Sequence, residues 1–145
     1  MVKIKVKKLI ESAILPSYGH PGDAGLDFYA AEDFVLTHEM RHAVSTGISM
    51  ALPEGYVALV WDKSGLAAKK GITVLGGVID AHYRGEYKII LYNTERDDFV
   101  IRKGDKVAQV LVQPIVSAEI EEVEELSETA RGEGGFGSTG GSRVD

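Results

Sequence analysis

The chain contains no cysteine, which excludes a disulfide framework, a thiolate nucleophile and a zinc–thiolate site. It also contains no apolar run that approaches the length of a membrane span. Residues 1–8 alternate apolar and basic side chains, so they lack the apolar core of a signal peptide and are typical of an edge strand. We therefore expect a cytoplasmic protein without a membrane partner.

Basic residues are outnumbered, since 16 Lys and Arg stand against 22 Asp and Glu, for a net charge of −6. A nonspecific nucleic-acid coat needs a basic stripe, so no nucleic-acid partner is expected. The 145 residues can bury the core of one domain without a structural metal. A few placed cations, a metal or backbone amides are still enough to bind a polyanion locally.

Long helical periodicity is absent, whereas short alternating runs separated by turn signals recur through most of the chain. This pattern predicts an all-β sandwich or barrel. One short helix is expected at residues 66–70, with Ser64 as its cap and Gly71 at its end. Residues 119–128 mix acids with apolar side chains, as in a last strand or a short amphipathic segment. We divide the chain into a core, 1–128, and a flexible glycine-rich arm, 129–145.

Residues 77–93 form the stretch around which the rest is organised, and the strand-like runs on its two sides are 72–79 and 87–93. Two strand-like runs flank a polar centre with glycines at its bends, which predicts a β-hairpin. Asp80 and Tyr83 can then face one small ligand, the carboxylate for chemistry and the ring for shape. The alternative is an ordinary hairpin with a solvated Asp and a half-buried Tyr.

Further candidate positions are weak when taken singly. Lys63 and Ser64 precede the expected helix, where free amides attract anions, although a well-capped helix explains them equally. Asp27 follows a loop and is usable for the water shell of a metal, or only as a capping group. Gln109 lies in an apolar strand, either on its outer face or as a buried donor with a dedicated partner. The arm is either a solvated tail or a lid whose amides, hydroxyls and Phe136 close over a nucleotide.

Taken in order, five short motifs resemble those of the trimeric dUTP diphosphatases (dUTPases). The resemblance spans residues 24–140. The motifs are Ala24-Gly25-Leu26-Asp27, Lys63-Ser64-Gly65-Leu66-Ala67, Gly77-Val78-Ile79-Asp80 to Tyr83-Arg84-Gly85, Gly104-Asp105-Lys106-Val107-Ala108-Gln109, and Arg131-Gly132 to Gly134-Gly135-Phe136-Gly137-Ser138-Thr139-Gly140.

The resemblance implies a distorted β-barrel or jelly-roll-like subunit with one short helix. It also implies a homotrimer with active sites shared between subunits and a swapped C-terminal arm. The implied reaction is Mg²⁺-assisted hydrolysis of dUTP to dUMP and pyrophosphate, which keeps uracil out of DNA and supplies dUMP for thymidylate synthesis. By similarity Asp80 activates the water that attacks the α-phosphate, and Tyr83 packs against the deoxyribose and excludes a 2′-hydroxyl.

The remaining site residues follow from the same resemblance. Asp27 would contact Mg²⁺ through water. The residues expected to bind base and sugar are Gly77, Val78, Ile79, Tyr83 and Phe136. The residues expected to bind the phosphates are Lys63, Ser64, Gly65, Gln109, Arg131, Gly137, Ser138 and Thr139.

The sequence departs from the family pattern at two positions within the motifs. Lys63 stands where the second motif commonly has Arg, which keeps the charge and loses the bidentate fork. His82 stands where many relatives have Asp. Two rival functions remain: a dCTP deaminase, which shares the fold but attacks the base, and a non-catalytic trimer that binds nucleotide without turnover.

Overall fold

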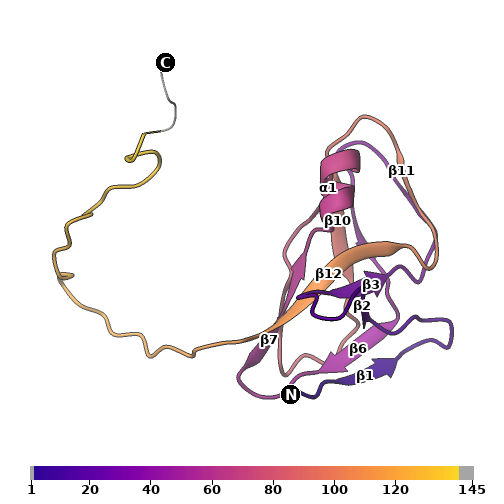
Figure 1. The fold of residues 1–145 in the computed structure, drawn as a ribbon, viewed down its shortest axis with the longest axis horizontal. Helices are drawn as coiled ribbons and strands as arrows, with labels where there is room; N and C mark the ends of the chain where they lie inside the picture. The colour runs from indigo at the N-terminus through magenta and orange to yellow at the C-terminus, as the bar shows by residue number, and fades with distance from the viewer. Residues whose placement is uncertain (1, 141–145) are drawn as a thin grey trace.

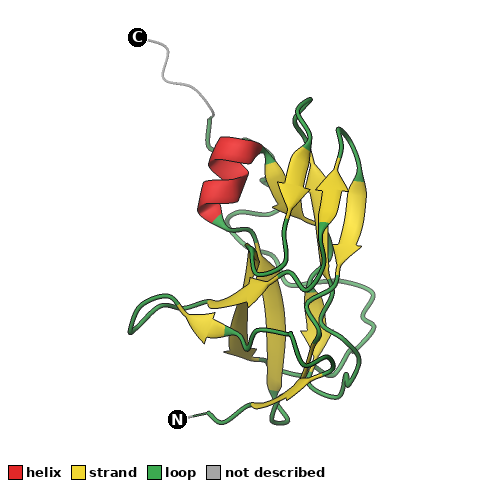
Figure 2. Cartoon of the chain, turned by 90° about the vertical axis from the view of Figure 1, so that its right-hand side faces the viewer, coloured by secondary structure: helices red, strands yellow, loops and turns green. Residues whose placement is uncertain are grey.

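The computed structural model describes residues 2–140, and strands build nearly all of its regular structure (Figures 1 and 2). The expectation of an all-β fold with one short helix is confirmed. No helix in the described part of the chain is long and apolar enough to cross a membrane. The elements are β1 (Lys5–Lys8), β2 (Ser17–Tyr18), β3 (Leu26–Tyr29), β4 (Phe34–Leu36), β5 (Arg41–Val44), β6 (Ile48–Ala51), β7 (Tyr56–Trp61), α1 (Ser64–Lys70), β8 (Ile72–Val74), β9 (Val78–Asp80), β10 (Ile89–Asn93), β11 (Phe99–Ile101) and β12 (Lys106–Pro114).

All strand pairs are antiparallel. The largest sheet has five strands in the order β2-β3-β12-β7-β9, and a second has the order β5-β10-β8. The pairs β1-β6 and β11-β4 complete the body. Apart from β2-β3, every pair joins strands that are not consecutive in the chain, as in a jelly-roll-like fold.

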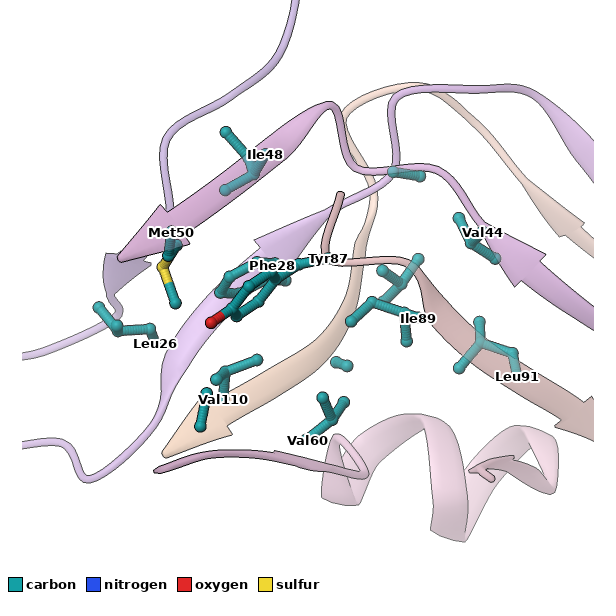
Figure 3. Close-up of a cluster of buried hydrophobic side chains, with 14 of the residues drawn as sticks. Leu26, Phe28, Val44, Ile48, Met50, Val60, Tyr87, Ile89, Leu91 and Val110 are labelled. Carbon is teal, nitrogen blue, oxygen red and sulfur yellow. The ribbon is translucent and has the colours of Figure 1, made fainter. Parts of the chain in front are cut away.

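The core lies between these sheets and follows from strand alternation. Along β10, for example, Ile89 and Leu91 are buried while Ile90 is exposed. At the centre of the cluster the ring of Tyr87 stacks on that of Phe28, with centroids 6.0 Å apart (Figure 3). Long-range pairing of short strands therefore encloses one hydrophobic core.

The helix α1 lies beside β8 at one end of the body (Figure 2). It ends as predicted, because Gly71 adopts a left-handed conformation (φ 58°) and its N–H binds the carbonyl of Ala67 at 3.2 Å. The expected cap is wrong. Lys63 occupies the N-cap position, Ser64 is the first helical residue, and no side chain caps the helix. The first turn therefore keeps amide groups free for another partner.

The predicted hairpin over residues 72–93 forms only in part: the outer ends of its two runs pair antiparallel, and the part nearer the bend does not. β8 pairs with β10, but the segment between them leaves this sheet, and its β9 pairs with β7 instead. The first run is therefore divided between two sheets, with β8 beside β10 and β9 beside β7. Between β8 and β10 the chain enters the five-stranded sheet as β9, which ends at Asp80. It then returns through the loop that contains Tyr83 to β10 in the other sheet.

The chain leaves the body after β12 and extends away from it (Figure 1). Residues 119–128, expected as a last strand or a short amphipathic segment, form neither a strand nor a helix. The apolar side chains of this stretch face solvent, with Ile120 95% and Leu126 86% exposed. The extended segment thus begins ahead of residue 129, where composition alone places the start of the arm.

Candidate active site

One candidate site is a pocket of about 460 Å³ between the two largest sheets, which we call the Asp80 pocket. Gly77 sets its shape, because it has φ 110°, and its carbonyl accepts the N–H of Val60 at 2.8 Å. An added Cβ at Gly77 would lie 3.0 Å from the carbonyl oxygen of Val60, so only glycine permits this approach. The lining residues are Ala43, Val60, Val74, Leu75, Gly77, Val78, Ile79, Asp80, Tyr83, Glu86, Lys88 and Ile90.

A tight turn brings the two predicted residues of this pocket together. Asp80 ends β9 with an exposed side chain, and its carbonyl accepts the N–H of Tyr83 at 3.1 Å. The Tyr83 side chain is 46% exposed, and its hydroxyl donates to the carbonyl of Glu86 at 3.1 Å. A carboxylate and an aromatic ring thus border one largely apolar cavity. His82, between them, is exposed and does not line the pocket.

A second candidate site, the Asp27 site, assembles three of the motifs through strand register. Gln109 on β12 is paired with Asp27 on β3 and with Trp61 on β7. Lys63 lies two residues after Trp61, so it lies at the same end of these paired strands as Asp27 and Gln109. The resulting cavity of about 310 Å³ is lined by Gly19, His20, Asp23, Ala24, Gly25, Asp27, Lys63, Lys106 and Gln109.

Asp27 is the charged centre of this second site and is only 5% exposed. One carboxylate oxygen pairs with the ammonium group of Lys63, and the other lies 2.8 Å from Nζ of Lys106. Burial alone raises the pKa of Asp27, but the hydrogen bonds and charges of the two lysines outweigh it, so the pKa lies below its ordinary value. The same carboxylate raises the pKa of Lys106. The site therefore holds one anion between two cations.

Lys106 stands in the fourth motif but was assigned no role from the sequence, and a β-bulge explains how it reaches Asp27. Lys106 is paired with Tyr29 and Ala108 with Phe28, so Val107 is an extra residue in β12. In an unbroken strand, Lys106 and Gln109 would face opposite sides, since they are three positions apart and side chains alternate. The bulge brings both to the Asp27 site. Two consecutive buried positions, Val107 and Ala108, mark it in the structure.

Gln109 has the dedicated partner that one of the two sequence interpretations required. Its Nε2 donates to the carbonyl of Asp62 at 2.8 Å. The Asp62 carboxylate in turn accepts the Thr73 hydroxyl at 2.8 Å and the Val74 N–H at 2.6 Å. These bonds fix the segment that leads from β7 into α1, and with it the position of Lys63.

The two candidate sites lie far apart within one chain. Asp80 is paired with Val57, whereas Gln109 is paired with Trp61, four residues further along β7 and on its other side. Four residues span roughly 13 Å and two strand spacings about 10 Å, so the Cα atoms of Asp80 and Gln109 are on the order of 16 Å apart. Hydrogen-bond reach cannot join them.

The arm contacts neither site in the described chain. Phe136 is fully exposed, and Nε of Arg131 donates to the carbonyl of Gly134, inside the arm, at 2.8 Å. The structure therefore places the predicted arm residues Arg131, Phe136, Gly137, Ser138 and Thr139 away from both sites of their own chain (Figure 1).

Comparisons with known proteins agree on one family. The dUTPase family model matches residues 11–140. The chain is 52% identical over 140 residues to the deoxyuridine 5′-triphosphate nucleotidohydrolase of Paramecium bursaria Chlorella virus 1, which covers 97% of this chain and 99% of that protein. It is 49% identical over 142 residues to the protein of that name from Clostridioides difficile, with 97% and 99% covered.

Solved structures give the same result. The Staphylococcus bacteriophage 80alpha dUTPase with dUPNHPP matches with a TM-score of 0.85 and 31% identity, over 95% of this chain and 98% of that one. An Asp-to-Asn mutant of the dUTPase from phage phi11 of S. aureus, described as showing the coordination of a structural Mg(II) ion, matches with a TM-score of 0.81 and 29% identity, over 87% and 99%. The chain therefore belongs to the dUTPase family, and it is an enzyme that hydrolyses dUTP.

Proposed function

We propose that this enzyme converts dUTP to dUMP and pyrophosphate by attack of an Asp80-activated water on the α-phosphorus. The observation that carries the proposal is the turn that sets Asp80 and Tyr83 on one apolar pocket, three residues apart. A general base must lie within hydrogen-bond reach of the proton that it removes. The exposed Asp80 carboxylate at the pocket edge is open to such a water. The product would supply dUMP, and loss of dUTP would keep uracil out of DNA.

Tyr83 is the proposed sugar gate. Its half-exposed ring borders the pocket beside Asp80 and would pack on the deoxyribose. Attack at the α-phosphorus places the sugar next to the carboxylate of Asp80, which activates the water. A ring in van der Waals contact with the 2′ carbon leaves no space for an added oxygen. Steric rejection of this kind discriminates where a merely apolar pocket does not.

The backbone of β9 is suited to reading the uracil. β9 ends the five-stranded sheet, so one edge binds β7 and the other faces away from it. An edge strand presents N–H and C=O groups that can pair with the donors and acceptors of a base. We assign Gly77, Val78 and Ile79 to this role, since all three line the Asp80 pocket. Phe136 would stack on the base when the arm closes.

The Asp27 site is the proposed triphosphate site. Lys63 and Gln109 line it, and the uncapped first turn of α1 adds the Ser64 hydroxyl and the Gly65 amide. Lys106 joins them, because its ammonium group is held at the same carboxylate. Arg131, Gly137, Ser138 and Thr139 would reach the outer phosphates from the arm.

Asp27 fits a water-mediated role at Mg²⁺. Residues 2–140 contain no cluster of three ligating side chains. Mg²⁺ commonly keeps several waters and takes one or two carboxylates plus substrate phosphates, which matches a single buried carboxylate beside an anion cavity. When bound, the ion would neutralise charge on the phosphates.

A homotrimer with shared sites accounts for the separation between the Asp80 pocket and the Asp27 site. The α-phosphorus is bonded directly to the sugar oxygen, so the Asp80 pocket and the phosphate-binding groups must meet within a few ångströms. A distance on the order of 16 Å within one chain supports an arrangement in which the Asp27 site of a neighbouring subunit faces the Asp80 pocket. The extended arm, with its exposed apolar side chains, supports the same arrangement, since such side chains need a surface to cover.

Pyrophosphate release in the presence of Mg²⁺ tests the proposal, with dUTP, dCTP, dTTP and UTP assayed in parallel. We expect release from dUTP and its loss by a factor of about 100 or more in Asp80→Asn, with nucleotide binding retained. Release of ammonia from dCTP would indicate a deaminase instead. Full activity of Asp80→Asn would assign the base to another residue.

A further inference from the structure

The ring of Tyr83 lies directly on the backbone of Gly85. A Cβ built at Gly85 would lie 2.9 Å from Cε2 of Tyr83 and closer still to its hydroxyl oxygen. Real Cβ atoms essentially never approach a neighbour that closely, so any side chain at this position displaces the ring. The space left by the missing Cβ is therefore part of what positions Tyr83.

The backbone of Gly85 does not need glycine for any other reason that the structure shows. Gly76 and Gly77 have φ values of 70° and 110°, in the left-handed region, whereas Gly85 lies outside that region. From the sequence we expected all three glycines to serve bends. Gly85 is instead required because a Cβ at this position would collide with the Tyr83 ring. An alanine at Gly85 is therefore free of backbone strain, and its one direct effect falls on Tyr83.

Glu86 holds the same, hydroxyl end of the Tyr83 side chain. Its carbonyl accepts the Tyr83 hydroxyl, and its own side chain is tied to the loop at residues 45–47. The carboxylate oxygen Oε1 accepts the Ser45 hydroxyl, the Thr46 N–H at 3.1 Å and the Gly47 N–H at 2.8 Å. Burial raises the pKa of Glu86, but these hydrogen bonds outweigh it and leave the pKa lowered.

A second contact keeps this turn in one conformation. The Arg84 guanidinium donates to the carbonyls of Ala81, at 2.6 Å, and Tyr83, at 2.9 Å. The turn that carries Tyr83 is thus fastened from both sides before any substrate binds. A ring placed in advance can reject an extra oxygen, whereas a ring free to move would yield to it.

We propose that Gly85 and Glu86 are positioning residues that set selectivity for deoxyribose, Gly85 by leaving room for the Tyr83 ring and Glu86 by holding its hydroxyl. The inference rests on the sugar-gate role proposed for Tyr83. It adds that the gate is fixed by its own turn, so that selectivity is lost when the ring moves even though Tyr83 itself is unchanged.

The decisive variant is Gly85→Ala. Its Cβ would move the Tyr83 ring by roughly 1 Å, a misplacement large enough to matter in a preorganised site. We expect the ratio of kcat/KM for dUTP to that for UTP to fall by about tenfold or more, with little change in the thermal midpoint of unfolding. Calorimetric binding of dUMP and UMP gives a second readout that needs no turnover.

A matched pair of variants tests the Glu86 contact. Glu86→Gln keeps an oxygen that can accept the same bonds, so selectivity should stay close to that of the unmodified enzyme. Glu86→Ala removes the anchor, and the ratio should fall. Tyr83→Phe removes only the hydroxyl bond and should lose less selectivity than Gly85→Ala, because the ring still rests on Gly85.

The outcomes separate this inference from the proposed function. If the unmodified enzyme binds dUMP and UMP equally, the sugar-gate role fails and the inference fails with it. If the unmodified enzyme discriminates and folded Gly85→Ala discriminates equally, the sugar gate stands and the inference is overturned. If Gly85→Ala does not fold, equal selectivity in Glu86→Ala and Glu86→Gln overturns the inference, and a loss confined to Glu86→Ala supports it.

Discussion

The hydroxyl of Tyr87 is buried in the core without a hydrogen-bond partner among the described residues. The residue is 0% exposed, and its ring stacks on Phe28 (Figure 3). Burial raises the pKa of this hydroxyl, as expected for a group kept from water. A phenylalanine would fill the same space with no polar atom. We therefore expect Tyr87→Phe to stabilise the protein.

The size of this effect follows from two opposing contributions. Burying a hydroxyl without a partner costs about 1–3 kcal/mol by protein mutational data. Removing one oxygen forfeits a few dispersion contacts of about 0.1–0.2 kcal/mol each and leaves a small void. The net gain in the free energy of unfolding should be about 1 kcal/mol per chain. In a domain of this size, that corresponds to a rise of roughly 3 °C in the thermal midpoint.

Urea unfolding at one fixed subunit concentration measures the effect, because oligomerisation makes apparent stability depend on concentration. Tyr18→Phe is the control, since the Tyr18 side chain is 54% exposed and its replacement should change stability by less than about 0.5 kcal/mol. A Tyr87→Phe protein less stable than the unmodified one by 1 kcal/mol or more would refute the reasoning. It would mean that the hydroxyl has a favourable partner, such as a buried water.

Three further predictions concern the active site. A chain that ends at residue 128 should keep its thermal midpoint and lose most of its dUTP hydrolysis; retained pyrophosphate release would remove the arm from the mechanism. Asp27→Asn should destabilise the protein at neutral pH, because two lysines lose their counterion. Since the pKa of Asp27 is lowered below its ordinary 3.8, this stability difference should be fully present above pH 3.8 and shrink as the pH falls through the lower folded value, and equal denaturation curves at neutral pH would contradict it. Lys63→Arg should keep kcat/KM within about tenfold because the charge remains, whereas Lys63→Ala should lower it by about 100-fold; steady-state kinetics decides.

Local signals in the sequence were sufficient for the elements that depend on near neighbours. The end of α1 at Gly71 was predictable because one residue with positive φ terminates the helix. The alternation of β10 marked a strand with one buried face. The five motifs were also sufficient to identify the family, because their order along the chain is specific even though each motif is weak by itself.

Pairing between distant strands could not be predicted in the same way. β9 follows a glycine pair that resembles a hairpin bend, yet it joins β7 because that pairing lets Gly77 lie against Val60. The bulge at Val107 has no signature in the sequence, so nothing local indicated that Lys106 reaches Asp27. Both features depend on partner strands, which choose the register where local propensity does not.

The placement of Asp80 and Gln109 along β7 has a consequence for mixtures of chains. In the proposed trimer each catalytic centre takes its water-activating carboxylate and its arm from different copies. Chains carrying Asp80→Asn and chains that end at residue 128 would each be inactive alone. Refolded together, they would form assemblies in which some centres combine an intact Asp80 from one parent with an intact arm from the other. A mixture of two inactive variants would then show activity. This complementation cannot occur when each active site is contained within one chain.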